Sequence, residues 1–124
     1  FQGRQLGWLD ANLGERGLPA DRRPETAMAW MDQPVPWRAM PGLASDEQLD
    51  ALRAAEGAAA DTLFLELMAD HHRGGLHMSN YAASNAESPD VRAMAATMAN
   101  LQEIDIAEYR DVARREGLPA EIGP

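Results

Sequence analysis

Cysteine is missing from the 124-residue sequence, and its absence removes three kinds of chemistry at once. Without a thiol the chain has no disulfide, no thiolate zinc site and no cysteine nucleophile. The only side chains left that bind soft or borderline metal ions are seven methionines and three histidines.

The sequence also lacks a long apolar run and is poor in basic residues. No stretch of about eighteen apolar residues occurs, so no membrane insertion is expected of this chain. No basic segment followed by an apolar stretch opens it, so we expect any export signal to have been removed or to lie outside this sequence. The formal net charge of −9 argues against nucleic acid and anionic membrane surfaces as partners, and it is compatible with a cation.

Three catalytic sequence patterns are absent as well. Ferritin-type di-iron bundles need Glu-x-x-His pairs, but the residues three before the histidines are Met68, Ala69 and Gly74. The His-Glu-x-x-His pattern of zinc peptidases and the glycine-framed serine turn of hydrolases are missing too. We therefore expect a protein that is not an enzyme.

The remaining signals predict an all-α fold in one globular domain. Ser45-Asp46-Glu47-Gln48 has the form of a capping box and opens a short helix that should end near Gly57. A long helix is expected over about 58–85, with Gly74-Gly75 as a soft spot. Ser88-Pro89 opens a last helix that should continue to residue 116.

The two ends of the chain repeat each other at an offset of 100 positions. Gln2 matches Gln102, Leu6 matches Ile106, and Gly-Leu-Pro-Ala followed by an acidic residue closes both copies. Gly-Leu-Pro after a helical stretch is a helix stop. Each copy should therefore be the second helix of a hairpin, and the first copy is expected to lack its partner helix.

This repeat divides the chain into three predicted segments. Residues 1–17 form the C-terminal helix of a first hairpin, 18–44 an irregular proline-rich linker, and 45–124 a helical hairpin. Alternatively, residues 1–3 are the remnant of a cleavable tag. A groove left by a missing helix could be filled by a second copy, which predicts a possible homo-oligomer. The linker side chains expected to lie on the core are Met28, Trp30, Met31, Trp37 and Met40.

The helix expected over residues 58–85 carries histidines and methionines on one face. At 3.6 residues per turn this face spans roughly 120 degrees. It holds Asp61, Phe64, Met68, His71, His72, Gly75 and Met78. His77 points the other way and should face solvent. The packing partner should be a face of the last helix made of Val91, Met94, Ala95, Met98, Leu101, Gln102, Asp105, Tyr109 and Val112.

One interpretation of this face is a metal site. Imidazole nitrogens with thioether sulfurs and no thiolate suit a soft monovalent ion such as Cu(I). The predicted ligands are Met68, His71 and Met78, with His72 a fourth ligand or a hydrogen-bonded neighbour. Supporting or alternative ligands are Asp61, Gln102, Asp105, Met98 and Tyr109.

The alternative interpretation is a structural or protein-interaction module that binds no metal. A buried imidazole needs a hydrogen-bond partner, and Gln102 or Asp105 would supply one. Methionines at helical spacing are also ordinary packing residues.

The histidine face resembles the bacterial domain-of-unknown-function family numbered 305. The run from Asp61 through Phe64, Met68, His71-His72 and Gly75 to Met78 carries the likeness, together with "MAWM" (28–31), "MPGLAS" (40–45) and Gln102-x-x-Asp105-Ile106. The resemblance implies a ferritin-like four-helix bundle in exported or membrane-attached proteins, hence an extracytoplasmic location. It also implies copper or silver binding through methionine and histidine in some members.

The sequence departs from the family pattern at three points around this face. Asp105 replaces the usual glutamate, Tyr109 stands where the family has a methionine, and Leu43 replaces a common methionine in the linker. Met94 and Met98 occupy positions that are usually aliphatic, which favours a packing role for both. These changes keep the predicted ligands but remove sulfur from their surroundings.

Overall fold

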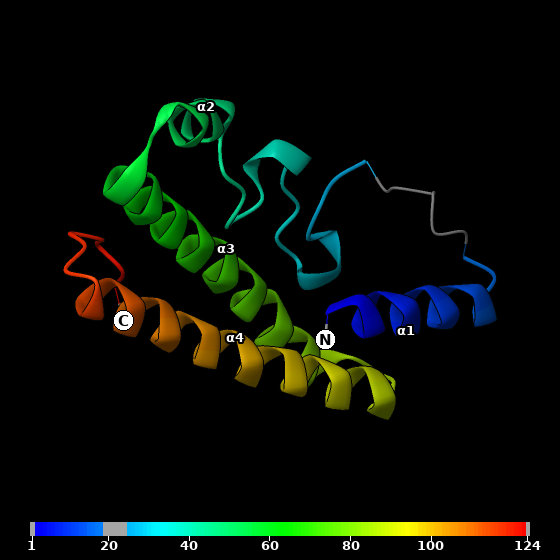
Figure 1. The fold of residues 1–124 in the computed structure, drawn as a ribbon. Coiled ribbons are helices and arrows are strands. Elements are labelled where there is room, and N and C mark those ends of the chain that lie inside the picture. Colours follow the sequence, from blue (N-terminus) through cyan, green and yellow to red (C-terminus); the bar gives the residue numbers. More distant parts are fainter. Residues whose placement is uncertain (1, 19–24, 124) are drawn as a thin grey trace.

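The structure is a computed structural model that describes residues 2–18 and 25–123. Its dominant feature is a hairpin of two long helices, α3 (Gly57–Asn85) and α4 (Pro89–Arg115), which lie side by side (Figure 1). Residues 2–18 and 25–123 form no β-strand apart from a single bridge between Ala27 and Val35. The all-α prediction is therefore confirmed.

The buried side chains of α3 and α4 are largely small. On α4 the buried residues are Ala95, Ala99, Ile106 and Ala113, and on α3 they are Leu65, Ala69, His72, Ser79 and Gly74, the last of which faces the linker. Alanine and glycine let helix backbones approach their neighbours closely. After the turn that joins the two helices, the first turn of α4 is capped. Ser88 accepts a hydrogen bond from the Val91 amide, and Pro89 occupies the first helical position.

The two chain ends form the same helix stop, as their sequence repeat predicts. α1 (Gln2–Glu15) ends in a left-handed Gly17 with φ 67°, and α4 ends in a left-handed Gly117 with φ 64°. The Leu18 amide donates to the Leu13 carbonyl at 2.9 Å, and the Leu118 amide donates to the Ala113 carbonyl at 2.9 Å. This is the Schellman pattern, and it satisfies carbonyls that the helix end would leave unpaired.

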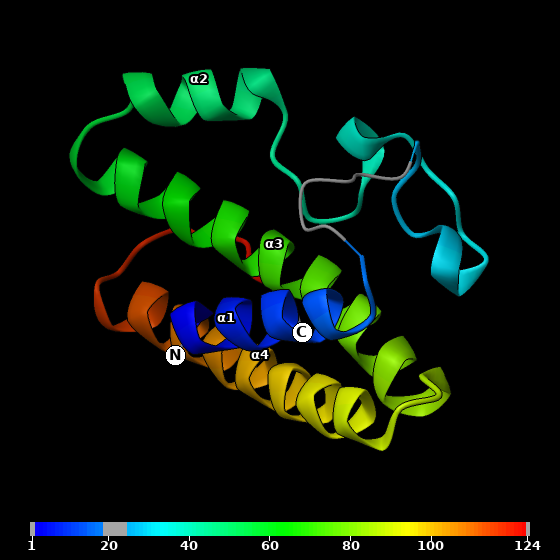
Figure 2. The ribbon, with the colours of Figure 1, turned by 90° about the vertical axis from the view of Figure 1, so that its right-hand side faces the viewer.

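The short helix α2 (Asp46–Ala54) begins at the predicted capping box. Ser45 accepts from the Gln48 amide, and the Gln48 side chain accepts from the Ser45 amide at 2.8 Å. The helix ends at Ala54 and not near Gly57, because Gly57 has a φ of 56° and is already the first residue of α3. Figure 2 shows α2 lying across the first turns of α3.

The described part of the linker, residues 25–44, folds over α3 around a small methionine core. It contains two single-turn helices, η1 (Ala29–Met31) and η2 (Trp37–Ala39). The buried centre is Ala27, Met28 and Met31, and the half-buried side chains packed against it are Val35, Met40, Met78 and Tyr81. The expectation that all the large linker side chains lie on the core is only partly right.

Two tryptophans are the exceptions. Trp30 is 56% exposed and lies edge to face against Tyr81, and Trp37 is 40% exposed. Exposed aromatic rings of this kind belong to the outer face of the linker.

α3 runs through the Gly74-Gly75 pair without interruption. A Cβ on Gly74 would lie 2.1 Å from the Pro41 carbonyl oxygen, and one on Gly75 would lie 1.9 Å from Oε1 of Gln102. The two glycines therefore give the linker backbone on one side, and a side chain of α4 on the other, room to touch the helix.

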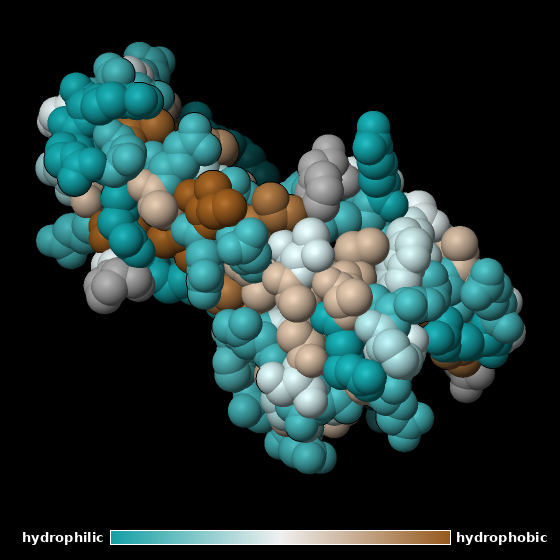
Figure 3. Space-filling model, turned by 90° about the horizontal axis from the view of Figure 1, so that it is seen from below, coloured by the Kyte–Doolittle hydropathy of each residue, from teal (hydrophilic) through white to brown (hydrophobic). Residues whose placement is uncertain are grey.

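α1 approaches the hairpin with its first turns, where Gln5 is buried, and its Glu15 end points away from α3 and α4 (Figure 1). Seen from the α4 side, apolar side chains gather near the middle of the molecule and polar ones surround them (Figure 3). Within the described ranges no helix is long and apolar enough to cross a membrane. Of the predicted segments, residue 1 of the first helix, residues 19–24 of the linker and residue 124 of the hairpin lie outside the described residues.

Candidate functional site

His72 occupies the centre of the α3–α4 interface. Only 4% of the residue is exposed. Its Nδ1 lies 2.8 Å from the Met68 carbonyl oxygen, one turn earlier on α3. Its Nε2 lies 3.1 Å from Oδ2 of Asp105 and 3.4 Å from the hydroxyl of Tyr109, both on α4. One imidazole thus joins the two helices.

Both groups that face the His72 ring are acceptors, the Met68 carbonyl on one side and the Asp105 carboxylate on the other. In one neutral tautomer Nδ1–H donates to Met68, and the lone pair of Nε2 is directed at Asp105. In the other, Nε2–H donates to Asp105. In the first tautomer a cation between Nε2 and the carboxylate would make their contact favourable.

His71 has the same arrangement in a more open position. Its ring is exposed, and its Nδ1 lies 3.1 Å from the carbonyl oxygen of Gly42 in the linker. Nδ1 therefore donates, and Nε2 holds the lone pair. The rings of His71 and His72 lie 6.0 Å apart at an angle of 81°. Two neighbouring imidazoles thus each have a backbone carbonyl at Nδ1, which is the contact that metal-binding histidines often make with the ring nitrogen that does not bind the metal.

Tyr109 completes the polar group around His72. The two rings are in edge contact, with centroids 5.2 Å apart. Partial burial raises the pKa of the Tyr109 hydroxyl, and the negative charges of Asp105 and Glu108 raise it further. The hydroxyl therefore stays protonated at neutral pH and can donate to Nε2 of His72.

The raised pKa of Tyr109 makes a testable prediction. Replacing Asp105 with asparagine should lower this pKa, because a negative charge beside the phenol is lost. A pKa raised in the folded state stabilises the fold below pH about 10, and this contribution is lost as the pH rises through the folded pKa. Tyrosinate absorbance against pH measures the shift, with Tyr81→Phe in the background to remove the second tyrosine. An unchanged pKa in the Asp105→Asn variant would contradict the assigned cause.

The four predicted ligands do not share one crevice. Met78 packs into the methionine core of the linker, whereas His72 faces α4 and His71 faces Gly42. Met68 contributes its carbonyl oxygen to His72. The shared helix face is real, but α4 covers one part of it and the linker covers another. That these residues bind metal stays a prediction.

The predicted supporting residues also lie in different places, and only some of them contact His72. Asp105 and Tyr109 reach His72, but Gln102 does not: its amide donates to Ser79 at 3.2 Å and to the Met98 carbonyl at 3.4 Å. Asp61 is exposed near the start of α3. His77 is exposed as predicted, and its Nε2 lies 3.1 Å from the side-chain oxygen of Gln33.

Sequence reasoning missed Gly42, whose carbonyl accepts from His71. Its φ of 86° is left-handed, and a Cβ there would lie 2.9 Å from the Asp70 carbonyl oxygen. Its signals were the Pro41-Gly42 pair, which predicts a turn, and its place in the family-like run 40–45, and neither predicts its contact with α3.

The donors around His72 have separations that one metal ion could accept. Two donors bound about 2.0–2.1 Å from one ion, at an angle of about 95–110°, lie roughly 3.0–3.4 Å apart. The distances from Nε2 to Asp105 and Tyr109 are 3.1 and 3.4 Å. Among residues 2–18 and 25–123, however, no three side chains drawn from histidine, aspartate and glutamate converge. A complete ligand set would thus need Tyr109 or water.

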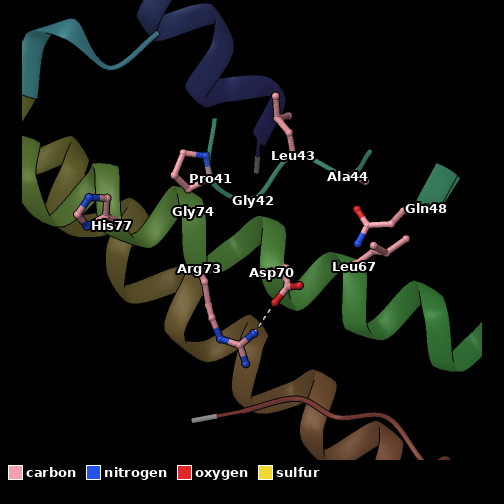
Figure 4. A pocket seen from close by; sticks show the side chains of 10 residues that line it. All are labelled: Pro41, Gly42, Leu43, Ala44, Gln48, Leu67, Asp70, Arg73, Gly74 and His77. Carbon is pink, nitrogen blue, oxygen red and sulfur yellow. Dashed lines mark hydrogen bonds and ion pairs between the residues drawn. The ribbon is translucent and has the colours of Figure 1, made fainter. Parts of the chain in front are cut away.

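A pocket opens on the other side of the Gly42 contact. It measures about 320 Å³ and lies between linker residues 41–44, α2 and α3. Figure 4 shows Asp70 and Arg73 in its wall, joined by an ion pair of 2.7 Å. None of the predicted ligands lines it, so it is separate from the histidine pair.

Comparisons with known proteins agree with the fold. A family model described as "Domain of unknown function (DUF305)" matches residues 2–113. A crystal structure from Streptomyces coelicolor, described as a DUF305 protein and a candidate secreted protein, is 29% identical with a TM-score of 0.82. The match covers 99% of this chain and 71% of that one. No curated protein matches the chain.

Proposed function

The chain belongs to the DUF305 family, and from its histidine pair we propose that it is an extracytoplasmic bundle that binds copper or silver ions without catalysis. The observation that carries the proposal is the backbone carbonyl that faces Nδ1 of each ring, Met68 for His72 and Gly42 for His71. In the tautomer in which Nδ1–H donates to that carbonyl, each Nε2 has its lone pair available to a metal ion.

His72 is the proposed anchor of the ion. It is held from both helices, and Asp105 and Tyr109 stand at ligand-like distances from the same nitrogen. Nitrogen and oxygen donors suit Cu(II) better than Cu(I). A monovalent copper or silver ion would instead draw on the sulfur of Met68 and on His71.

Access to the proposed site is one-sided. His72 is 4% exposed at the level of its side chain, while the Asp105 side chain is 42% exposed. An ion would enter and leave past the carboxylate, with the exposed His71 ring beside it. This openness favours sequestration with exchange, or transfer to a partner, over permanent structural binding.

The proposed location outside the cytoplasm rests on a similar protein and not on a feature of this chain. The matched Streptomyces coelicolor protein is described as a candidate secreted protein. Copper handling outside the cytoplasm is consistent with a site that offers no thiolate.

Calorimetric titration with Cu²⁺ and, separately, Ag⁺ tests the proposal. We expect one site for Cu²⁺, weakened roughly ten- to a hundredfold by Asp105→Asn, which removes a charged oxygen beside the bound ion. Asp61→Asn is the matched control, because that carboxylate is exposed on α3 and has no described contact with either histidine. Equal affinity in the wild type and Asp105→Asn, or no heat of binding at all, would count against the site.

The alternative function is a structural or interaction module with no metal. It is favoured by one observation: within the described ranges, every buried side-chain nitrogen and oxygen already has a hydrogen-bond partner. A protonated His72 paired with Asp105 would satisfy the interface without an ion. In that case the melting temperature would not respond to Cu²⁺ or Ag⁺, whereas a bound ion raises it by mass action.

A further inference from the structure

Residues 118–123, which follow α4, lie against the hairpin and are held there through their backbone. The Glu121 amide donates to Oε1 of Glu66 on α3 at 2.8 Å. Two residues later, the Gly123 carbonyl oxygen accepts hydrogen bonds from two arginines, at 2.7 and 3.1 Å. None of these three contacts uses a side chain of the 118–123 segment, so the hairpin recognises its peptide groups and not its particular sequence.

The two arginines approach the same oxygen from different helices. Arg73 donates from Nη2, and its side chain extends from α3 toward the 118–123 segment (Figure 4). Arg110 donates from Nε, belongs to α4 and is half-buried. Guanidinium groups bind charged oxygens best, because a hydrogen bond between two charged groups is roughly twice as strong as one between neutral groups. The Gly123 carbonyl, which is neutral, uses only part of what this pair of arginines offers.

The two arginines carry one positive charge more than their ion-pair partner. Asp70 pairs with Arg73 at 2.7 Å. Arg110 forms no ion pair within residues 2–18 and 25–123, and its bond to Gly123 uses only the Nε–H. A ligand with a single negative charge would balance the pair. A dianion such as phosphate fits less well, since Asp70 and Glu66 already place carboxylates around the site and the chain has a net charge of −9.

We propose that Glu66, Arg73 and Arg110 form a docking site for the C-terminal end of an extended peptide of another protein, with its free carboxylate between the two arginines. Residues 121–123 show the spacing that the site accepts: one amide reaches Glu66, and the carbonyl two residues later reaches the arginines. In the docked peptide the terminal carboxylate replaces the Gly123 carbonyl and supplies the missing charge. The chain's own segment covers the site until such a peptide displaces it. None of the three residues is a predicted metal ligand, so docking needs no metal ion.

The probe is a synthetic peptide with the sequence of residues 118–123, prepared once with a free C-terminal carboxylate and once with an amide. Each form is titrated into isotope-labelled protein in the presence of a chelator, and the side-chain NMR signals of Arg73 and Arg110 report binding. The protein carries Glu121→Pro, which removes the amide that donates to Glu66 and so weakens the competing internal segment. We expect the free acid to bind about tenfold more tightly than the amide.

Variants of the arginines test the assigned role of the charge. Arg110→Gln should remove the preference for the free acid, and Arg110→Lys, which keeps the charge but loses the planar fork, should retain part of it. Arg114→Gln is the matched control, because this exposed arginine of α4 pairs with Asp111 and should not affect binding. Circular dichroism verifies that the variants keep their helices. The proposal is overturned if the free acid and the amide bind equally, if Arg110→Gln keeps the preference, or if the free acid leaves both arginine signals unchanged.

Discussion

Replacing His72 with alanine should abolish the metal-dependent rise in melting temperature and lower the free energy of unfolding by about 2–4 kcal/mol. Two costs add. The ring is 4% exposed, so its removal leaves a cavity between α3 and α4. The Asp105 carboxylate and the Tyr109 hydroxyl also lose the nitrogen that they face.

The neighbouring histidines provide graded controls for this variant. His71→Ala loses one hydrogen bond to Gly42 at an exposed position, which should cost about 1 kcal/mol or less and weaken metal binding without abolishing it. His77→Ala removes only an exposed contact with Gln33 and should change neither property. Urea denaturation measures stability, and thermal melts with and without Cu²⁺ measure the ion response. If His72→Ala melted like the wild type, the buried polar group would not have the role described.

Gly74→Ala should destabilise the protein by about 1–3 kcal/mol and displace the linker from α3. The new methyl group would meet the Pro41 carbonyl oxygen at 2.1 Å and the Gly42 Cα at 3.0 Å. Both are backbone atoms that cannot turn aside, so the linker must move and His71 should lose its contact with Gly42. The gain in helix propensity of alanine over glycine, about 1 kcal/mol, offsets part of this cost.

Gly75→Ala is the control that separates collision with backbone from collision with a side chain. Its methyl group would meet Gln102, a flexible side chain that can rotate away and give up its bond to Ser79. We expect a smaller loss of stability than for Gly74→Ala, with the linker in place. Urea denaturation compares the two variants, and the NMR signal of the His71 ring reports the linker contact. A larger effect at Gly75 would show that the linker backbone is not held at Gly74.

The helices could be predicted because their ends are marked by capping residues that lie close together in the sequence. Ser45, Ser88-Pro89 and the two glycine stops act within a few residues, so sequence spacing was sufficient to place them. Asp105 could be paired with His72 for a similar reason: two amphipathic helices joined by a short turn must pack face to face.

The site could be predicted only in part, because a helical wheel does not say which segment covers each turn. Met78 lies on the face of His72 but six residues further along, about 9 Å at 1.5 Å per residue. At this position along α3, Met78 packs against linker residues. Gly42 was missed because its contact with α3 spans 29 residues of chain, and such long-range contacts leave no periodic signal.

The seat of the linker on α3 has a consequence for how this segment can move. The Pro41 carbonyl and the Gly42 Cα meet Gly74 backbone to backbone, and His71 contacts the carbonyl of the next peptide group, that of Gly42. One helical turn earlier or later along this face, α3 carries side chains in place of glycine, so the linker backbone can approach the helix this closely only at this position.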